Sequence, residues 1–219
     1  MLNHDDILED YILRHIDAEP AELHDLYRYT HLYCLYPRMC SGHYQGRLLK
    51  MLTAMVRPRR VLEVGTFTGY STLSIAEGLE PGAVIDTVEI DEEKRDLLLE
   101  RFGASPYAAS INLHIGDALD VVKGLSGPYD MVFIDANKRF YMDYLEAVLP
   151  MVPVGGFVLV DNTLWDMKVV GADNIRDAQT AAIAAFNDAV ASDRRFEKVI
   201  LPVRDGLTIL RRIRQDTDL

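Results

Sequence analysis

The sequence has few of the residues that mark several common classes of protein. Its two cysteines, Cys34 and Cys40, form neither a zinc-type spacing nor a disulfide framework, so we expect two reduced thiols. Lysine and arginine total 23 against 34 aspartate and glutamate residues, and the net charge of -11 disfavours nonspecific binding to nucleic acid. No apolar run approaches the roughly 20 residues that span a bilayer. The acidic start lacks signal-peptide character, and we expect a cytoplasmic protein with no nucleic-acid or membrane partner.

The sequence does contain an alternation of short apolar runs and helical segments. Residues 1–57 show only helical spacing, with helices expected at 7–16, 21–36 and 48–55 and a loop at 37–42. Strands are then expected at 61–64, 84–88, 111–115, 131–134, 157–160, 198–202 and 207–213, with helices at 68–79, 91–102, 139–149 and 175–190. This alternation is typical of an α/β protein whose parallel sheet carries helices on both faces.

The last two expected strands break the alternation. The link at 203–206 is too short for a crossover helix, so these strands should form an antiparallel hairpin. We therefore predict a seven-stranded, mostly parallel sheet of Rossmann-like type with an antiparallel last strand. We see no linker or internal repeat, so we expect one domain, with a helical N-terminal segment at 1–57 and the Rossmann-like core at 58–219.

A glycine loop, Glu-Val-Gly-Thr-Phe-Thr-Gly-Tyr-Ser at 63–71, follows the first expected strand. Ligands of open α/β sheets bind outside the carboxyl ends of the strands, and Gly65 and Gly69 would let the backbone approach one closely. Phe67 stands where the dinucleotide fingerprint has its second glycine, which disfavours a pyrophosphate. The loop therefore suits a nucleoside without that group, or it merely turns the chain.

Acidic residues end the second and third expected strands. Glu89 lies about 20 residues after the glycine loop, where an acid can accept hydrogen bonds from both ribose hydroxyls. The alternative for Glu89 is a solvated carboxylate, whereas Asp91 is expected to cap the following helix. Gly116 and Ala118 leave room for a flat base, and Asp117 either belongs to that site or only caps a helix.

The fourth and fifth expected strands end on oxygen ligands. Asp135 follows the fourth strand, with Lys138 just beyond it, and Asp161 and Asn162 follow the fifth. Carboxylate and amide oxygens without nearby histidine or cysteine suit Mg²⁺, or else Mn²⁺ or Ca²⁺, rather than zinc. The alternatives are two unrelated helix caps for the acids and a simple carboxylate pair for Lys138.

Together these motifs resemble the cation-dependent O-methyltransferases, the caffeoyl-CoA and catechol O-methyltransferase group that uses S-adenosylmethionine. The motifs are the glycine loop at 63–71, Glu89, Gly-Asp-Ala at 116–118, Asp-Ala-Asn-Lys at 135–138 and Asp-Asn-Thr-Leu-Trp at 161–165. The resemblance runs from about Met39 to the final strand. It implies a methyltransferase-type Rossmann-like sheet, which agrees with the antiparallel hairpin predicted above.

The resemblance also implies roles for individual residues. Those implied to bind S-adenosylmethionine are Met39, Ser41, Glu63, Gly65, Thr66, Ser71, Glu89, Gly116, Asp117, Ala118 and Asp135. Asp135, Asp161 and Asn162 would hold the cation, and Lys138 would act as general base beside Asp135. Trp165 and Tyr144 would contact the acceptor, but Trp165 could instead anchor its loop, and Tyr141 and Tyr144 could belong to the core.

The implied reaction transfers a methyl group to a hydroxyl of a catechol-like or hydroxycinnamoyl-type small molecule. An aryl oxygen would attack the sulfonium methyl in line, and a dication holding that hydroxyl would favour its deprotonated form. Gln45, where some members carry Glu, and Asn137, where Asp is common, depart from the family pattern. Arg204 could meet an anionic substrate tail, although a solvated turn residue is the simpler expectation.

The family resemblance further implies a homodimer whose helical N-terminal segment roofs the acceptor site. Two rival functions stay open at this point. One is an NAD-dependent oxidoreductase, against which Phe67 argues, and the other is a non-catalytic protein on the same fold. The intact set of Asp135, Asp161, Asn162 and Lys138 argues against the second rival, because a non-catalytic protein has no physical need for it.

Overall fold

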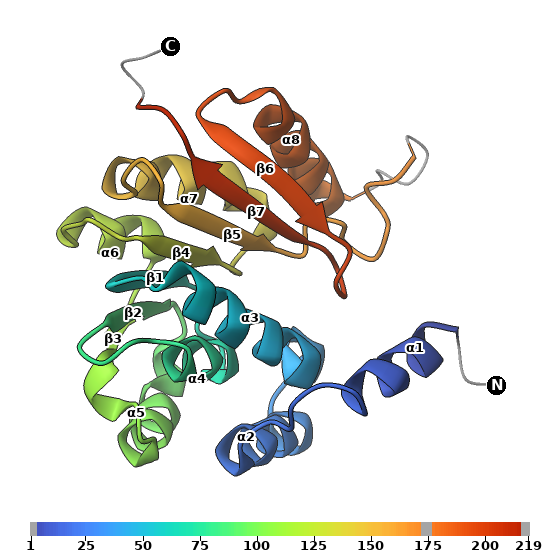
Figure 1. The fold of residues 1–219 in the computed structure, drawn as a ribbon, viewed down its shortest axis with the longest axis vertical. Helices are drawn as coiled ribbons and strands as arrows, with labels where there is room; N and C mark the ends of the chain where they lie inside the picture. Colours follow the sequence, from blue (N-terminus) through green and yellow to red (C-terminus); the bar gives the residue numbers. More distant parts are fainter. Residues whose placement is uncertain (1–3, 172–176, 216–219) are drawn as a thin grey trace.

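Seven strands form one sheet at the centre of the computed structural model, which describes residues 4–171 and 177–215 (Figure 1). The strand order is β3-β2-β1-β4-β5-β7-β6. The strands are β1 (Arg60–Val64), β2 (Val84–Glu89), β3 (Ile111–Ile115), β4 (Met131–Ile134), β5 (Phe157–Asp161), β6 (Phe196–Leu201) and β7 (Leu207–Arg212). All seven lie within two residues of their expected positions, so the strand predictions are confirmed.

The predicted antiparallel hairpin is present, and β7 is the antiparallel strand. β7 inserts between β5 and β6, pairing Val160 with Thr208 on one side and Leu201 with Leu207 on the other. The first five strands pair in parallel. β6 consequently forms the edge of the sheet and runs in the same direction as β1 to β5, which confirms the predicted mixed sheet.

The described helices cover both faces of this sheet. They are α1 (His4–Leu13), α2 (Ala21–Tyr33), α3 (Gly42–Val56), α4 (Tyr70–Glu77), α5 (Arg95–Ala104), α6 (Ala118–Gly124), α7 (Tyr141–Val148) and α8 (Ala178–Ser192). The described residues also form five short 3-10 turns, which lie next to these helices along the chain: η1 (Pro37–Met39), η2 (Glu92–Lys94), η3 (Ala108–Ser110), η4 (Lys138–Phe140) and η5 (Leu149–Met151). Figure 1 shows α3 crossing one face of the sheet and α1 extending away from the rest of the molecule.

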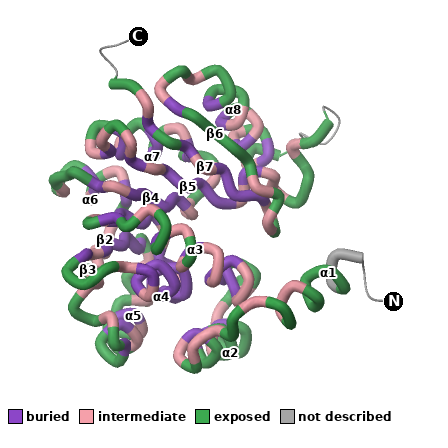
Figure 2. The backbone as a smooth tube through the Cα atoms, viewed as in Figure 1, coloured by how far each residue is buried: buried purple, intermediate pink, exposed green. Residues whose placement is uncertain are grey.

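Alternate residues of the central strands enter two separate cores. In β4, Met131 and Phe133 pack with residues of α3 and α4, whereas Val132 and Ile134 pack with α6, α7 and α8. All four side chains are fully buried, which is typical of a parallel strand covered on both faces. In Figure 2 the buried backbone follows the central strands, while α1 and α2 are largely exposed or intermediate.

Several helix boundaries differ from the sequence predictions. α2 ends at Tyr33 rather than at residue 36, because Tyr36 has a φ of 59° and precedes Pro37, which disfavours a helical conformation there. α4 starts at Tyr70 because Gly69 is left-handed, with a φ of 88°. α6 was expected only through the alternative in which Asp117 caps a helix, since it is too short for helical spacing to be visible. The expected start of the last helix, Ile175, lies outside the described residues.

Within the described residues, no helix combines the length and apolar character needed to cross a membrane.

Candidate active site

The carboxyl ends of β1, β2, β4 and β5 lie side by side along one edge of the sheet, and four acidic side chains come together at this carboxyl-end edge. Glu63 lies near the end of β1 and Glu89 ends β2, while Asp161 ends β5. Asp135 directly follows β4, where Ile134 pairs with Val160 of β5, so Asp135 and Asp161 follow neighbouring residues. This is the edge at which open α/β sheets bind ligands.

Asp135 forms an ion pair with Lys138. The Nζ atom of Lys138 lies 2.6 Å from Oδ1 of Asp135, and both side chains are largely buried. Asn137 caps η4, since its Oδ1 accepts a hydrogen bond from the backbone N–H of Arg139 at 3.2 Å. The carboxylate pair expected as an alternative for Lys138 is therefore present, and its role as a base stays a prediction. An amide oxygen at Asn137 makes the same cap that an aspartate would.

Asp161 is held from three directions. Its Oδ1 accepts from the backbone N–H of Asn162 at 2.9 Å and its Oδ2 from Nε2 of Gln45 at 2.7 Å, while its carbonyl accepts from the Tyr141 hydroxyl at 2.8 Å. Asn162 has a φ of 58°, a left-handed conformation that asparagine tolerates better than most residues. Burial, and then the charge of Asp135, raise the pKa of the Asp161 carboxyl group.

The donor set at this edge fits a hard divalent cation. Two carboxylates disfavour each other's charge in a buried position, and a cation between them would remove that conflict. The carboxylates of Asp135 and Asp161 and the amide oxygen of Asn162 are ligands of the type that Mg²⁺ and Ca²⁺ prefer. The described residues contain no group of three or more histidine, cysteine, aspartate or glutamate side chains placed to hold a metal. A cation here would therefore depend on Asn162 and on water or substrate.

Glu63 carries an unsatisfied buried oxygen. Its Oε2 accepts hydrogen bonds from the hydroxyl groups of Thr72 and Thr87, the second at 2.6 Å. Its Oε1 is buried without a hydrogen-bond partner in the described part of the chain. Complete burial raises the pKa of Glu63 to about 7, against the opposing effect of the surrounding hydroxyls. A cationic or N–H donor ligand would satisfy Oε1, which fits the amino group of S-adenosylmethionine.

Glu89 is buried, so the alternative of a solvated carboxylate is wrong, and contact with the ribose stays a prediction. Its Oε2 accepts from the backbone N–H of Phe67 at 2.7 Å, and its Oε1 accepts from that of Asp91 at 2.9 Å. Each carboxylate oxygen has a further lone pair with which to accept from a ligand hydroxyl. Asp91 caps η2 through the N–H of Glu93 at 3.0 Å, as expected.

Gly65 and Gly69 are required because other parts of the protein pack closely against them. A Cβ atom on Gly65 would lie 2.1 Å from the carbonyl oxygen of Asp135, and one on Gly69 would lie 2.6 Å from the ring of Phe102. Gly69 thus faces α5 rather than a ligand, which corrects the expectation for that residue. Gly65 lets the ends of β1 and β4 approach each other, and this approach helps to place Asp135.

The remaining residues predicted to bind the cofactor lie around the same edge. Thr66 is buried, with its hydroxyl 2.6 Å from that of Thr87. Ser71 lies in the first turn of α4, Ala118 begins α6, Gly116 directly precedes Asp117, and Ser41 directly precedes α3. Asp117 is the N-cap of α6, accepting from Leu119 N–H at 2.8 Å, and its place in the cofactor site stays a prediction. Met39 ends η1, and 56% of its surface is exposed.

The two residues predicted to contact the acceptor lie in different surroundings. Trp165 is partly buried in a left-handed conformation with a φ of 48°, and its N–H donates to the carbonyl of Asp205 at 3.1 Å. Tyr144 and Tyr141 both belong to α7 and pack in the core, so the core alternative holds for both. Contact of either Trp165 or Tyr144 with an acceptor stays a prediction.

Sequence reasoning missed the contact between Gln45 and Asp161 and the position of Arg204. Arg204 lies in the β6–β7 turn, yet its Nη1 donates to Oε1 of Gln45 and to the carbonyl of Cys40, each at 3.0 Å. Arg204 is exposed, as expected of a turn residue, but its side chain is also hydrogen-bonded to the protein. No local sequence pattern predicts this arrangement, because Gln45, Asp161 and Arg204 come from three segments far apart in the chain.

Comparison with known proteins identifies a family and relatives of similar sequence. The model of the O-methyltransferase family matches residues 14–213. A caffeoyl-CoA O-methyltransferase of Stellaria longipes is 32% identical over 178 residues, covering 77% of this chain and 74% of that protein. Caffeoyl-CoA O-methyltransferase 1 of Arabidopsis thaliana is 30% identical over 244 residues, covering 96% of this chain and 94% of that protein.

Two solved structures are similar over nearly the whole chain. The SAH-bound methyltransferase PaMTH1 of Podospora anserina has a TM-score of 0.89 at 26% identity and covers 98% of both chains. The O-methyltransferase TomG of Streptomyces achromogenes, involved in tomaymycin synthesis and solved in complex with SAM, has the same TM-score and identity. That similarity covers 98% of this chain and 100% of TomG.

Proposed function

The chain belongs to the O-methyltransferase family, and from that premise we propose that it is an S-adenosylmethionine-dependent enzyme that also uses a divalent cation. Its acceptor is a hydroxyl of a catechol-like or hydroxycinnamoyl-type small molecule. The observation that carries this proposal is the pair of carboxylates, Asp135 and Asp161, placed beside Lys138 at the ends of β4 and β5. Family membership decides against the NAD-dependent oxidoreductase considered as a rival.

The cofactor residues are proposed from the free acceptor atoms at the same edge. S-adenosylmethionine would supply a methyl group on a sulfonium, and the cation would supply charge that favours a deprotonated hydroxyl. Glu63 would accept from the amino group through its unpartnered Oε1. Glu89, held in place by two backbone N–H groups, would accept from the ribose hydroxyls. The two similar structures that hold SAH and SAM support this part of the proposal.

The chain's own contribution to the chemistry is to hold the acceptor and to take its proton. Asp135, Asp161 and Asn162 would hold the cation. Lys138 Nζ is kept at this edge by Oδ1 of Asp135 at 2.6 Å, and in its neutral form it would accept the proton of the acceptor hydroxyl. The centroid of the buried Tyr141 ring lies 5.5 Å from the same nitrogen.

The homodimer expected from the family is part of this proposal. Large apolar side chains on α1, at the end of α2 and in the loop after it are more than half exposed: Ile7, Leu8, Tyr11, Leu32, Tyr33, Leu35 and Tyr36. A second copy of the chain would cover such surface. Light scattering during gel filtration tests this part, because a monomer at micromolar concentration would contradict it.

The test of the proposed function is methylation of caffeic acid and of caffeoyl-CoA by the purified protein. We expect product only with S-adenosylmethionine and a divalent cation, and we expect EDTA to stop the reaction until Mg²⁺ is added back. Full turnover in EDTA would contradict the cation's role. Absence of turnover on a wide panel of catechols, with S-adenosylmethionine bound, would favour the non-catalytic alternative. The ratio of the two substrates' kcat/KM values then tells whether the acceptor is a CoA ester.

A further inference from the structure

Three side chains connect the β6–β7 turn to the proposed cation site. Arg204 Nη1 donates to Oε1 of Gln45 at 3.0 Å, and Nε2 of Gln45 donates to Oδ2 of Asp161 at 2.7 Å. Gln45 lies in the first turns of α3, and only 2% of its surface is exposed. The buried Gln45 amide therefore joins three segments of the chain through hydrogen bonds at both its oxygen and its nitrogen.

Arg204 determines which way the Gln45 amide points. A guanidinium carries hydrogen-bond donors and no acceptor, so only the amide oxygen can face it. The amide nitrogen must then face Asp161, where it is a donor to a carboxylate. Arg204 itself is fixed by the backbone, since it also donates to the carbonyl groups of Arg38, Cys40 and Ser41.

The orientation of the Asp161 carboxylate depends on such partners. The terminal torsion of an aspartate is broad and has no strong preferred angle of its own. In this chain the two carboxylate oxygens are held separately, Oδ2 by Gln45 and Oδ1 by the N–H of Asn162. Rotation of the carboxylate would break both hydrogen bonds, each of which is strengthened by the charge.

We propose that Gln45 is a positioning residue that, with its amide oriented by Arg204, fixes the Asp161 carboxylate for a divalent cation. This inference rests on the proposed function, because it takes Asp161 as a ligand of the cation. It also gives a physical reason for the departure from the family pattern at this position. Glutamine supplies a donor to Asp161, whereas an ionised glutamate would set an acceptor against an acceptor.

The experiment measures binding of Mn²⁺ alone by calorimetry, with no S-adenosylmethionine and no acceptor. The variants are Gln45→Met, which keeps the length of the side chain and removes both polar ends, and Arg204→Met, which frees the amide. Gln179→Met, at a partly buried position near the start of α8, is the matched control. We expect the Mn²⁺ dissociation constant to rise about 10- to 100-fold in Gln45→Met, the usual effect of removing a partner of a metal ligand. Arg204→Met should weaken binding by a smaller factor, and Gln179→Met should not change it.

Crystal structures of the metal-free wild type and Gln45→Met supply a readout that does not depend on the cation. The Asp161 carboxylate should be rotated or disordered in the variant only. Wild-type Mn²⁺ affinity in Gln45→Met, or an unmoved carboxylate, would overturn the inference and leave the proposed function intact. If the wild type itself does not bind Mn²⁺, the cation's place in the proposed function fails, and the inference fails with it. Should Gln45→Met not fold, unchanged affinity in Arg204→Met decides against the inference.

Discussion

The Nζ atom of Lys138 lies 2.6 Å from Oδ1 of Asp135, so the proposed base is paired with a proposed ligand of the cation. The two residues are separated by a single turn, and the cap at Asn137 sets the backbone that joins them. A cation bound to Asp135 would compete with Lys138 for the same carboxylate. Binding of a cation at Asp135 would therefore disturb the ion pair that holds the Lys138 amine.

We predict that Lys138→Ala lowers kcat about 100- to 10,000-fold, the usual contribution of a positioned general base. S-adenosylmethionine should bind to this variant with nearly unchanged affinity, because Glu63 and Glu89 are untouched. The measurement is a steady-state methylation assay together with calorimetry of the cofactor. Lys123→Ala, which removes an exposed lysine paired with Asp120, is the control. Wild-type turnover in Lys138→Ala would show that another group takes the proton.

Glu63→Gln should weaken binding of S-adenosylmethionine about tenfold or more, since a hydrogen bond to a charged group is worth about 1.5–3 kcal/mol. The same change should stabilise the ligand-free protein at pH 8. The pKa of Glu63 is raised from 4.5 to about 7, so the folded state binds the proton more tightly than the unfolded state. Wild-type stability from this group is greatest at low pH and falls as the pH rises from 4.5 to 7.

Thermal unfolding at several pH values measures this effect. The melting temperature of Glu63→Gln should exceed that of the wild type at pH 8, and the difference should shrink toward pH 5. Thr163→Val, which removes a different buried hydrogen bond, is a control for the general loss of a buried polar contact. A pH-independent difference between Glu63→Gln and the wild type would mean that Glu63 is already ionised without cost in the folded protein.

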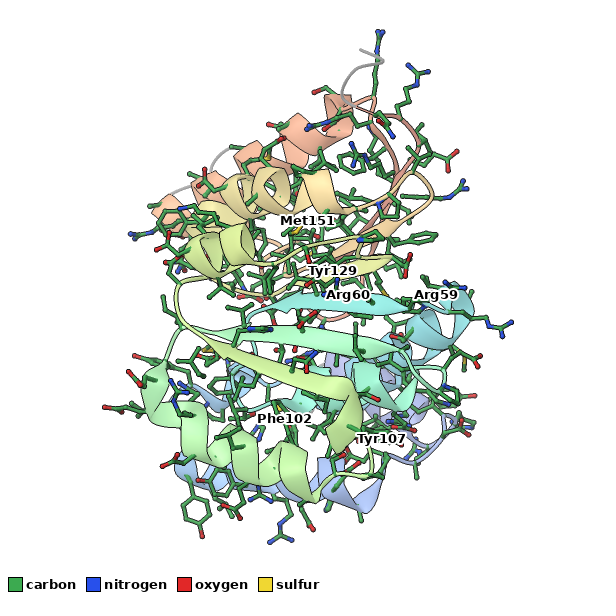
Figure 3. The ribbon with its side chains drawn as sticks, turned by 90° about the vertical axis from the view of Figure 1, so that its left-hand side faces the viewer. Arg59, Arg60, Phe102, Tyr107, Tyr129 and Met151 are labelled. Atoms are coloured by element: carbon green, nitrogen blue, oxygen red, sulfur yellow. The ribbon has the colours of Figure 1, made fainter. Side chains whose placement is uncertain are left out.

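Asp86 forms a second buried charge network. This network lies near the amino ends of β1 and β4, away from the candidate active site at their carboxyl ends. Its carboxylate accepts from Arg60, His114 and Tyr129, each at 2.9 Å, and Arg60 also stacks over the Tyr129 ring at 4.4 Å (Figure 3). Burial alone would raise the pKa of Asp86, but the hydrogen bonds from His114, Arg60 and Tyr129 lower it below its ordinary value.

We therefore predict that Asp86→Asn destabilises the fold by about 2 kcal/mol at pH 7, the scale of a hydrogen bond to a charged group. Because the pKa is lowered in the folded state, this stability is present above the unfolded value of about 3.9 and is lost as the pH falls through the folded value. Urea unfolding at pH 7 and at pH 3 is the measurement. An equal difference at both pH values would argue that the charge of Asp86 contributes nothing.

Much of this architecture could be predicted from the sequence because its signals are local. The four apolar residues of β4, all fully buried, are followed directly by Asp135. This run predicts both a central strand and an acidic residue at its carboxyl end. The short link at 203–206 predicts a hairpin because no helix fits there. Contacts between distant segments have no such signal, and the interaction of Gln45 with Asp161 and Arg204 required the folded chain. The end of α2 was missed because apolar residues continue beyond Tyr33, where the helix ends, as far as Tyr36.

Gly65 supplies the last prediction, which concerns the way the backbone places Asp135. Gly65→Ala would add a Cβ atom 2.1 Å from the carbonyl oxygen of Asp135, at a residue whose φ is 105°. The strand ends must separate to admit it, so we expect destabilisation of about 2 kcal/mol or more and weaker binding of Mn²⁺.

The matched control is Gly103→Ala. A Cβ atom at Gly103, within α5, meets nothing within 4 Å, and no left-handed backbone is required there. That substitution should leave Mn²⁺ binding unchanged and stabilise the protein by about 0.4–1 kcal/mol, because alanine lowers the entropy of the unfolded chain. Equal melting temperatures and Mn²⁺ affinities for the two variants would mean that the β1 and β4 ends move apart freely. In that case the close approach at Gly65 would not be what holds Asp135 in position.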